Sequence, residues 1–259
     1  DSKQRVLSDL FVRTINDLSG INDNPLLFRA VDQTIRAALS NQYVVLNNLE
    51  LLLSTLETVK KESEKNGVPL SSVKFDYEAS DDYADVRFYF INDAIRFDQN
   101  YRGGVVVKNG ECGASSFDVQ LILFNTECAN VIRTQVHYGL IHKAERVFRY
   151  SDIVNRIQGE LVYRKAAEMA AVLFEKENLQ RYYDKLIVSK QESLDVDKAQ
   201  IVMKRAFSQQ RIGIILDWWQ SQEERNLYGL AQAITHKCQD LSFAERERDE
   251  EFASRLLFA

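Results

Sequence analysis

Cations and aromatic residues alternate in the middle of this chain, in a pattern that suits contact with phosphates and bases. Arginine and lysine can neutralise phosphate oxygens, and an aromatic ring between them can stack on a base. The pattern stands out because the whole chain carries a net charge of −5. The candidate nucleic-acid-binding residues are Arg96, Tyr101, Arg102, Lys108, Arg133, Lys143, Arg146 and Arg149. The alternative is that these cations form an ordinary solvated helix face.

An enzyme is a second class of function that the residues allow. A cysteine with a histidine elsewhere in the chain can act as a nucleophile and its base, and Cys128 with His137 is the pair to consider. The glycine-rich phosphate loops, the nucleophile elbow and the metalloprotease helix motif have no match in the sequence. Gly103-Gly104 precedes a predicted strand rather than a helix, which favours a turn or bulge. We therefore expect no catalytic residues, with Cys128 buried at the exit of the last strand.

Metal binding is a third class, and the ligand spacing argues against it. Cys112, Cys128, His137 and His142 are the residues that could be combined into a zinc site. Zinc modules bring their cysteines as a close pair, whereas a predicted strand separates the two cysteines here. The acidic residues between 76 and 85 lack the spacing of a calcium loop and are typical of a solvated turn. We expect neither a metal nor a cofactor.

Composition is typical of a globular protein without membrane spans. The 259 residues are 45% hydrophobic and 27% charged, which is enough apolar material for a proper core. The three cysteines are an odd number, which argues against a secreted disulfide framework. No apolar run approaches the roughly 20 residues of a membrane span. We expect a cytoplasmic protein of the host cell, with a place in a virion as the alternative.

Hydrophobic periodicity predicts one α+β domain over residues 1–259, with helical parts at 1–67 and 128–259 and a sheet-rich part at 68–127. The predicted helices of the first part lie near 6–18, 25–39 and 47–66. The last of these has Asn47 or Asn48 as its N-cap and stops at Gly67. Alternation of apolar and polar residues predicts strands at 73–77, 86–90 and 117–123, and the valine run 105–107 after Gly103-Gly104 predicts a fourth. We expect a central antiparallel sheet of about four or more strands, packed against the N- and C-terminal helices.

The order of four short motifs resembles a phage/plasmid-like protein family of unknown function, found in mobile elements and their hosts. The first motif is Arg36-Ala37-Ala38-Leu39-Ser40-Asn41-Gln42-Tyr43 with Leu46-Asn47-Asn48, and the second spans 104–116 with Asn109, Glu111 and Gly113. The third is Cys128-Ala129-Asn130 with a downstream His137 or His142, and the fourth runs from Leu227-Tyr228-Gly229-Leu230 to Ala233-Ile234-Thr235. Gln42, Gly110 and Gln232 depart from the family pattern.

The resemblance implies work in phage or plasmid replication, recombination, packaging or virion assembly, and it lends no catalytic residues. The first hypothesis is a nucleic-acid-binding protein that binds or anneals single-stranded DNA in recombination or replication. Its broad plan would be similar to that of phage single-strand annealing proteins, which place a curved antiparallel sheet beside helices and assemble into rings. The alternative is a structural or interaction protein of a virion or phage complex. Expected partners are single-stranded DNA and either further copies of the chain or a phage protein complex, but no membrane.

Overall fold

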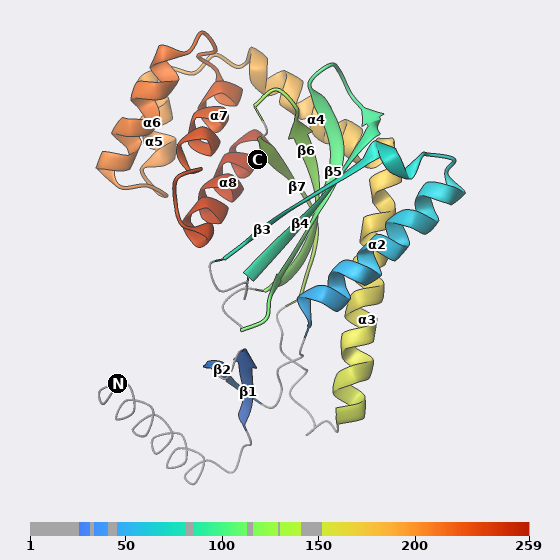
Figure 1. The fold of residues 1–259 in the computed structure, drawn as a ribbon. Coiled ribbons are helices and arrows are strands. Elements are labelled where there is room, and N and C mark those ends of the chain that lie inside the picture. The colour runs from blue at the N-terminus through green and yellow to red at the C-terminus, as the bar shows by residue number, and fades with distance from the viewer. Residues whose placement is uncertain are drawn as a thin grey trace, which may run out of the picture.

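The computed structural model describes residues 26–31, 34–40, 46–80, 85–112, 116–128, 130–140 and 152–258. Within these residues a five-stranded antiparallel sheet carries helices on both faces, and a separate two-stranded hairpin precedes it in the chain (Figure 1). The expected α+β class is therefore confirmed. None of the described helices is long and apolar enough to cross a membrane.

The five-stranded sheet is a meander in which each strand pairs with the next one along the chain. Its strands are β3 (Val73–Ala79), β4 (Asp85–Arg96), β5 (Tyr101–Gly110), β6 (Phe117–Asn125) and β7 (Val131–Leu140). The first four contain the predicted strands, which are confirmed. β7 is a correction, because the sequence pattern predicts helix from residue 128 onward. The segment is rich in β-branched residues, and pairing with β6 gives it a partner that local periodicity cannot reveal.

A second correction concerns the predicted helix near 25–39. This stretch forms the antiparallel hairpin of β1 (Leu26–Val31) and β2 (Thr34–Ser40). Arg29 on β1 lies 2.5 Å from Glu111, which follows β5. Apolar residues spaced by three and four suit a helix, but cross-strand pairing and this long-range ion pair override the local preference. The predicted helix near 6–18 lies outside the described residues.

The helix predicted at 47–66 is confirmed as α2 (Asn48–Lys65). Asn47 is its N-cap, and the side-chain oxygen accepts from the backbone N–H groups of Leu49 and Glu50 at 2.9 and 3.3 Å. This satisfies two of the donors that every helix start leaves open. Gly67 ends the segment at φ 63°, a left-handed conformation that favours glycine.

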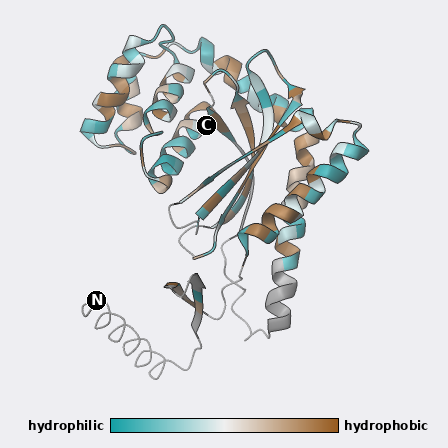
Figure 2. Cartoon of the chain, viewed as in Figure 1, coloured by the Kyte–Doolittle hydropathy of each residue, from teal (hydrophilic) through white to brown (hydrophobic). Residues whose placement is uncertain are grey.

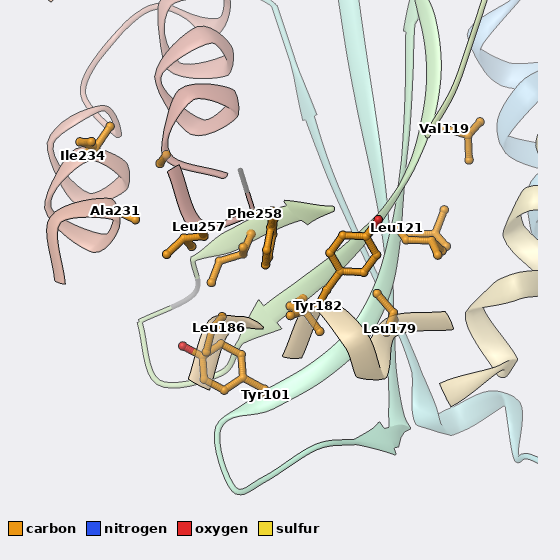
Figure 3. Close-up of a cluster of buried hydrophobic side chains, with 14 of the residues drawn as sticks. Tyr101, Val119, Leu121, Leu179, Tyr182, Leu186, Ala231, Ile234, Leu257 and Phe258 are labelled. Carbon is orange, nitrogen blue, oxygen red and sulfur yellow. The ribbon is translucent and has the colours of Figure 1, made fainter. Parts of the chain in front are cut away.

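The two faces of the sheet differ in chemistry because side chains alternate along each strand. The apolar face consists of Phe88, Phe90, Val105, Val107, Val119, Leu121 and Leu123, all of which are buried. It is covered by α3 (Asp152–Ala171) and α4 (Lys176–Gln191), which contact β6. Figure 3 shows Leu179 and Tyr182 of α4 within this core, close to Phe258 at the C-terminal end of the chain. The ring centroids of Tyr182 and Phe258 are 5.1 Å apart.

The remaining helices lie on the opposite side of the sheet, with the last of them against β7 (Figure 1). They are α5 (Val196–Met203), α6 (Gln209–Ser221), α7 (Leu227–Lys237) and α8 (Phe243–Phe258). Trp219 is 1% exposed while Trp218 lies nearer the surface, stacked on His236. One tryptophan of the pair therefore belongs to the core. Figure 2 shows hydrophobic residues gathered along the sheet strands and hydrophilic ones spread over these outer helices.

Gly103 and Gly104 lie inside β5 and do not form the turn that the sequence predicts. A methyl group on Gly104 would lie 2.8 Å from Ile122 and 3.0 Å from the carbonyl of Phe90. A methyl group on Gly103 would lie 2.5 Å from Ile95. The bulge is in the partner strand, since the register of β4 shifts between residues 92 and 96, opposite Arg102 and Gly103. Both glycines therefore serve close packing.

Candidate anion-binding site

Three of the four described cations that the sequence singles out have side chains no more than 13% exposed, and each of the three is paired with a carboxylate. Four cations and three carboxylates lie between the sheet and α8, and we call them the sheet–α8 charge network. Its members are Glu78, Arg87, Lys108, Arg133, Arg246, Glu247 and Glu250. The strand members share one face of the sheet because Arg87 stands opposite Glu78 on one side and Lys108 on the other.

Lys108 and Arg133, two predicted phosphate contacts, are held by α8. Lys108 Nζ lies 2.6 Å from Glu247 Oε1, and the Arg133 guanidinium lies 3.4 Å from Glu247 and 3.0 Å from Glu250. Their side chains are 13% and 6% exposed. A phosphate would have to displace the carboxylates of α8 to reach either cation, so neither offers a free charge to a ligand.

Arg87 is the centre of this network, and its side chain is completely buried. Its guanidinium lies 3.1 Å from Glu250 and 3.3 Å from Glu78, and it stacks over the ring of Phe243 at 4.3 Å. Burial by itself lowers the pKa of Arg87, but its neighbours, Tyr89 and Glu250 foremost, outweigh burial and raise the pKa. The arginine therefore stays charged and fastens α8 to the sheet.

Glu247 has cations on three sides. Burial raises the pKa of this carboxyl, but the hydrogen bond from Lys108 and the charges of Arg87 and Arg133 outweigh burial and hold the pKa below its ordinary value. Glu247 is therefore ionised at neutral pH. The arrangement has the features of a structural charge network, in which every member already has an opposite charge as its partner.

The predicted residues at the other end of β5 are also enclosed, with the exception of Arg96. Tyr101 is 1% exposed, and its hydroxyl lies 2.5 Å from that of Tyr228 on α7. The Arg102 guanidinium donates to the carbonyl of Asp98 at 2.9 Å and to those of two neighbouring residues, which closes the β4–β5 turn. Tyr101 thus has no ring face open to a base, and Arg102 stabilises a turn. The side chain of Arg96 is exposed.

Lys143, Arg146 and Arg149 lie outside the described residues, as does His142. The nucleic-acid contacts expected of the first three therefore stay predictions. The structure does not bring the described members of the predicted set to one open surface, because the charge network and the β4–β5 turn hold them at separate places.

A pocket of about 560 Å³ lies between the α5–α6 turn and α8. Arg205 from the turn and Arg248 and Arg255 from α8 line it, and all three arginines are exposed. Phe207 and Phe252 form its aromatic wall, with ring centroids 5.0 Å apart in an edge-to-face arrangement. We call this site the arginine pocket.

Positive charge exceeds negative charge in the arginine pocket. Asp249 also lines it, but this carboxylate is fully buried and is shared between Arg211 at 3.2 Å and Arg248 at 3.4 Å. Arg205 and Arg255 have no carboxylate at ion-pair distance within the part of the chain that the structure describes. Guanidinium groups present paired donors that match the oxygens of a phosphate. The pocket therefore suits an anion.

Sequence reasoning missed the arginine pocket because its residues are distant in the chain and lie among acidic ones. The α8 segment alternates in sign, a pattern typical of a solvated helix face. Arg248 and Arg255 are seven residues apart and so lie on one face of α8, two turns apart. That spacing is the one sequence feature that could have indicated the pocket, but nothing in the sequence places Arg205 beside Arg248 and Arg255.

Cys128 requires a correction, because the structure places it in an exposed turn after β6 and not at a buried site. It lines another pocket, of about 620 Å³, together with Lys190, Tyr228 and Glu127. Partial burial of the sulfur raises the pKa of the Cys128 thiol, and the nearby Glu127 charge adds to this. A thiol with a raised pKa is protonated at neutral pH and is a poor nucleophile. Asn130 is buried against Gln232, as a structural residue should be.

Comparison of the chain with protein-family models, with curated proteins and with solved structures finds no match. The fold and the pocket therefore define only the class of protein. It is an α+β protein with an antiparallel meander and an anion-compatible pocket beside its last helix. The resemblance to phage/plasmid-like proteins stays a prediction.

Proposed function

We propose that the protein binds single-stranded nucleic acid through the arginine pocket, in the replication or recombination of a phage or plasmid. The observation that carries the proposal is the convergence of Arg205, Arg248 and Arg255 around one aromatic-walled pocket. Nucleic-acid affinity arises mainly from phosphate neutralisation, and the pocket is lined by three arginines and only one carboxylate. The proposal keeps the class of ligand that the sequence suggests and moves the site from the sheet to α8.

The overall charge of the chain makes a local site necessary. A net charge of −5 repels a polyanion at long range, so binding depends on a few close contacts. Phe252 is partly exposed beside the arginines and can stack on a base or sugar, as aromatic rings do in single-strand binders. Contacts of this kind do not distinguish bases, so we expect little sequence preference.

The salt dependence of binding gives a quantitative test. Each phosphate neutralised on a single strand contributes about −0.7 to the slope of log affinity against log salt. Three arginine contacts therefore give a slope of about −2, and Arg248→Gln/Arg255→Gln should reduce its magnitude by about 1.4. The assay is fluorescence anisotropy with a labelled single-stranded thirty-mer from about 50 to 300 mM salt.

Two further variants make the test specific. Lys61→Gln/Arg164→Gln removes two exposed cations from α2 and α3, on the far side of the sheet from α8 (Figure 1), and should leave the slope unchanged. Arg146→Gln/Arg149→Gln tests the basic segment that the sequence singles out. A slope that changes only in this variant would place binding there and sink the arginine pocket. No binding by the wild type at about 50 mM salt and micromolar protein would sink the whole proposal.

The second candidate function is that of an interaction protein of a virion or phage complex. Leu49 and Leu53 favour it, because they lie one turn apart on α2 and are 63% and 56% exposed. Exposed apolar side chains that gather on one face mark interaction surfaces. Recovery of the chain in a large assembly free of nucleic acid, dispersed by Leu49→Lys/Leu53→Lys, would support this function over the first.

A further inference from the structure

β3 is an edge strand with one side free of pairing. It pairs with β4, and within the described residues no strand pairs with its outer side. Four consecutive residues at its centre, 74–77, are exposed. Phe75 and Tyr77 are 44% and 56% exposed, although both are large aromatic residues on the same face as the apolar core. Unpaired backbone groups along such an edge are a template for another strand.

The two faces of β3 carry different chemistry. Phe75 and Tyr77 share one face, and their rings stack with centroids 6.5 Å apart. Lys74, Asp76 and Glu78 share the other face, since side chains alternate along a strand. Edge strands are commonly protected by charges that repel a copy of themselves, but this edge carries both signs. Whether it repels or attracts another copy therefore depends on register.

Symmetry restricts the possible registers. If two copies join β3 to β3 in one continuous antiparallel sheet, the two-fold axis is perpendicular to the sheet and opposed side chains lie on the same face. The axis must then pass midway between one residue and the same residue of the second copy, which stands opposite it. An axis at Asp76 opposes two carboxylates, and an axis at Tyr77 opposes Asp76 and Glu78 twice.

An axis at Phe75 brings unlike charges together beside the axis. Lys74 then stands opposite Asp76 of the second copy, and the same pair repeats across the axis. On the other face Phe75 meets its own copy and Tyr77 meets Val73, so that the exposed rings are covered. Opposed charges and aromatic pairs are the contacts that stabilise cross-strand pairing. We propose that two copies of this chain associate through β3 in this register.

The ion pairs of β3 leave room for this association, whereas the hydrogen bond from the Tyr77 N–H to Asp76, at 2.8 Å, would have to open for it. Lys74 Nζ lies 2.9 Å from Asp93, but its side chain is 64% exposed and can reach a further carboxylate. Glu78 keeps its place in the sheet–α8 charge network, because it would face only Ser72 of the second copy. The dimer uses none of the arginine-pocket residues, so it does not depend on the proposed function. The edge is short, and we expect a weak dimer with a dissociation constant in the micromolar range.

Charge-swap variants test both the edge and the register. Lys74→Asp makes residues 74 and 76 both acidic, and Asp76→Lys makes them both basic. Like charges then face each other across the interface, so each variant alone should dimerise at least about 10-fold more weakly. The double variant Lys74→Asp/Asp76→Lys restores unlike pairs and should dimerise again. An equimolar mixture of the two single variants should form a one-to-one dimer. The measurement is sedimentation velocity from about 1 to 200 μM.

Lys61→Asp is the matched control, because Lys61 is 69% exposed and pairs with Glu57 as Lys74 does with Asp93. It should leave the dimer unchanged. A wild type that is monomeric at the highest concentration would overturn the proposal, and so would a dimer that persists in both single variants. If the single variants are monomeric and neither the double variant nor the equimolar mixture recovers the dimer, the proposed register is wrong.

A cross-linking measurement decides the question if the charge variants do not fold. In a background with Cys128→Ser, Phe75→Cys places a thiol opposite its own copy and should give a disulfide-linked dimer on oxidation. Tyr77→Cys faces Val73 of the second copy and should not. Equal cross-linking by the two variants would contradict the proposed register.

Discussion

Loss of one carboxylate from the sheet–α8 charge network should destabilise the protein more than loss of its buried arginine. Glu250 lies 3.1 Å from Arg87 and 3.0 Å from Arg133, whose side chains are 0% and 6% exposed. The network holds four cations and three carboxylates, an excess of one positive charge. Glu250→Gln raises the excess to two, whereas Arg87→Met leaves three charges of each sign.

The expected magnitudes follow from burial. Removing one partner of a buried ion pair costs about 3–5 kcal/mol. Glutamine keeps the shape of the side chain and one acceptor oxygen, so we expect about 3 kcal/mol for Glu250→Gln. Arg87→Met loses hydrogen bonds and the contact with Phe243, but methionine fills the space and the carboxylates keep their other cations. We expect about 1–2 kcal/mol for this change.

Urea unfolding followed by tryptophan fluorescence measures the difference. With a denaturant slope of about 3 kcal/mol/M, Glu250→Gln should lower the midpoint by about 1 M and Arg87→Met by about half as much. Glu57→Gln, which removes an exposed carboxylate paired with Lys61, is the control and should leave the midpoint unchanged. A midpoint loss for Arg87→Met that equals or exceeds that of Glu250→Gln would refute the charge count.

Three further predictions concern packing, pH and thiol reactivity. Gly104→Ala should destabilise by about 1–3 kcal/mol because the new methyl meets atoms at 2.8 to 3.0 Å, while Gly213→Ala on α6 meets open space and should stabilise by up to about 1 kcal/mol; thermal unfolding that shifts both in the same direction would contradict this. Folding lowers the pKa of Glu247, so its contribution to stability is present above about pH 4.3 and is lost as pH falls through the folded pKa. Glu247→Gln should therefore make the urea midpoint depend less on pH between about pH 5 and 3. An unchanged pH dependence would count against this role of Glu247. Cys128 is accessible and should react slowly with a thiol reagent in the native protein, because its raised pKa keeps it protonated. Cys238, which is buried with its pKa raised to about 12 by burial, should react only after unfolding; mass spectrometry that finds equal rates would disprove the assignment.

Local sequence patterns predict those helices and strands whose signals lie within their own residues. The cap at Asn47 and the glycine at 67 are local signals at the two ends of α2, so the helix could be predicted almost to the residue. The strands at 73–77, 86–90 and 117–123 alternate clearly, whereas β5 is buried on both faces and reads as an apolar run. β1, β2 and β7 could not be predicted in this way, because their pairing depends on partners rather than on periodicity.

The candidate site shows the larger gap between sequence and structure. Cations along the chain predict an open basic surface, but Lys108 and Arg133 lie beneath carboxylates from a helix more than a hundred residues away. Arg248 and Arg255 share a helix face by spacing alone, yet only the packing of the α5–α6 turn adds Arg205. Composition and periodicity establish the α+β class and α2, since these depend on neighbours in the chain. Which charges are neutralised and which stay free is decided by tertiary contacts, because a charge acts through space on whatever the fold brings within a few ångströms.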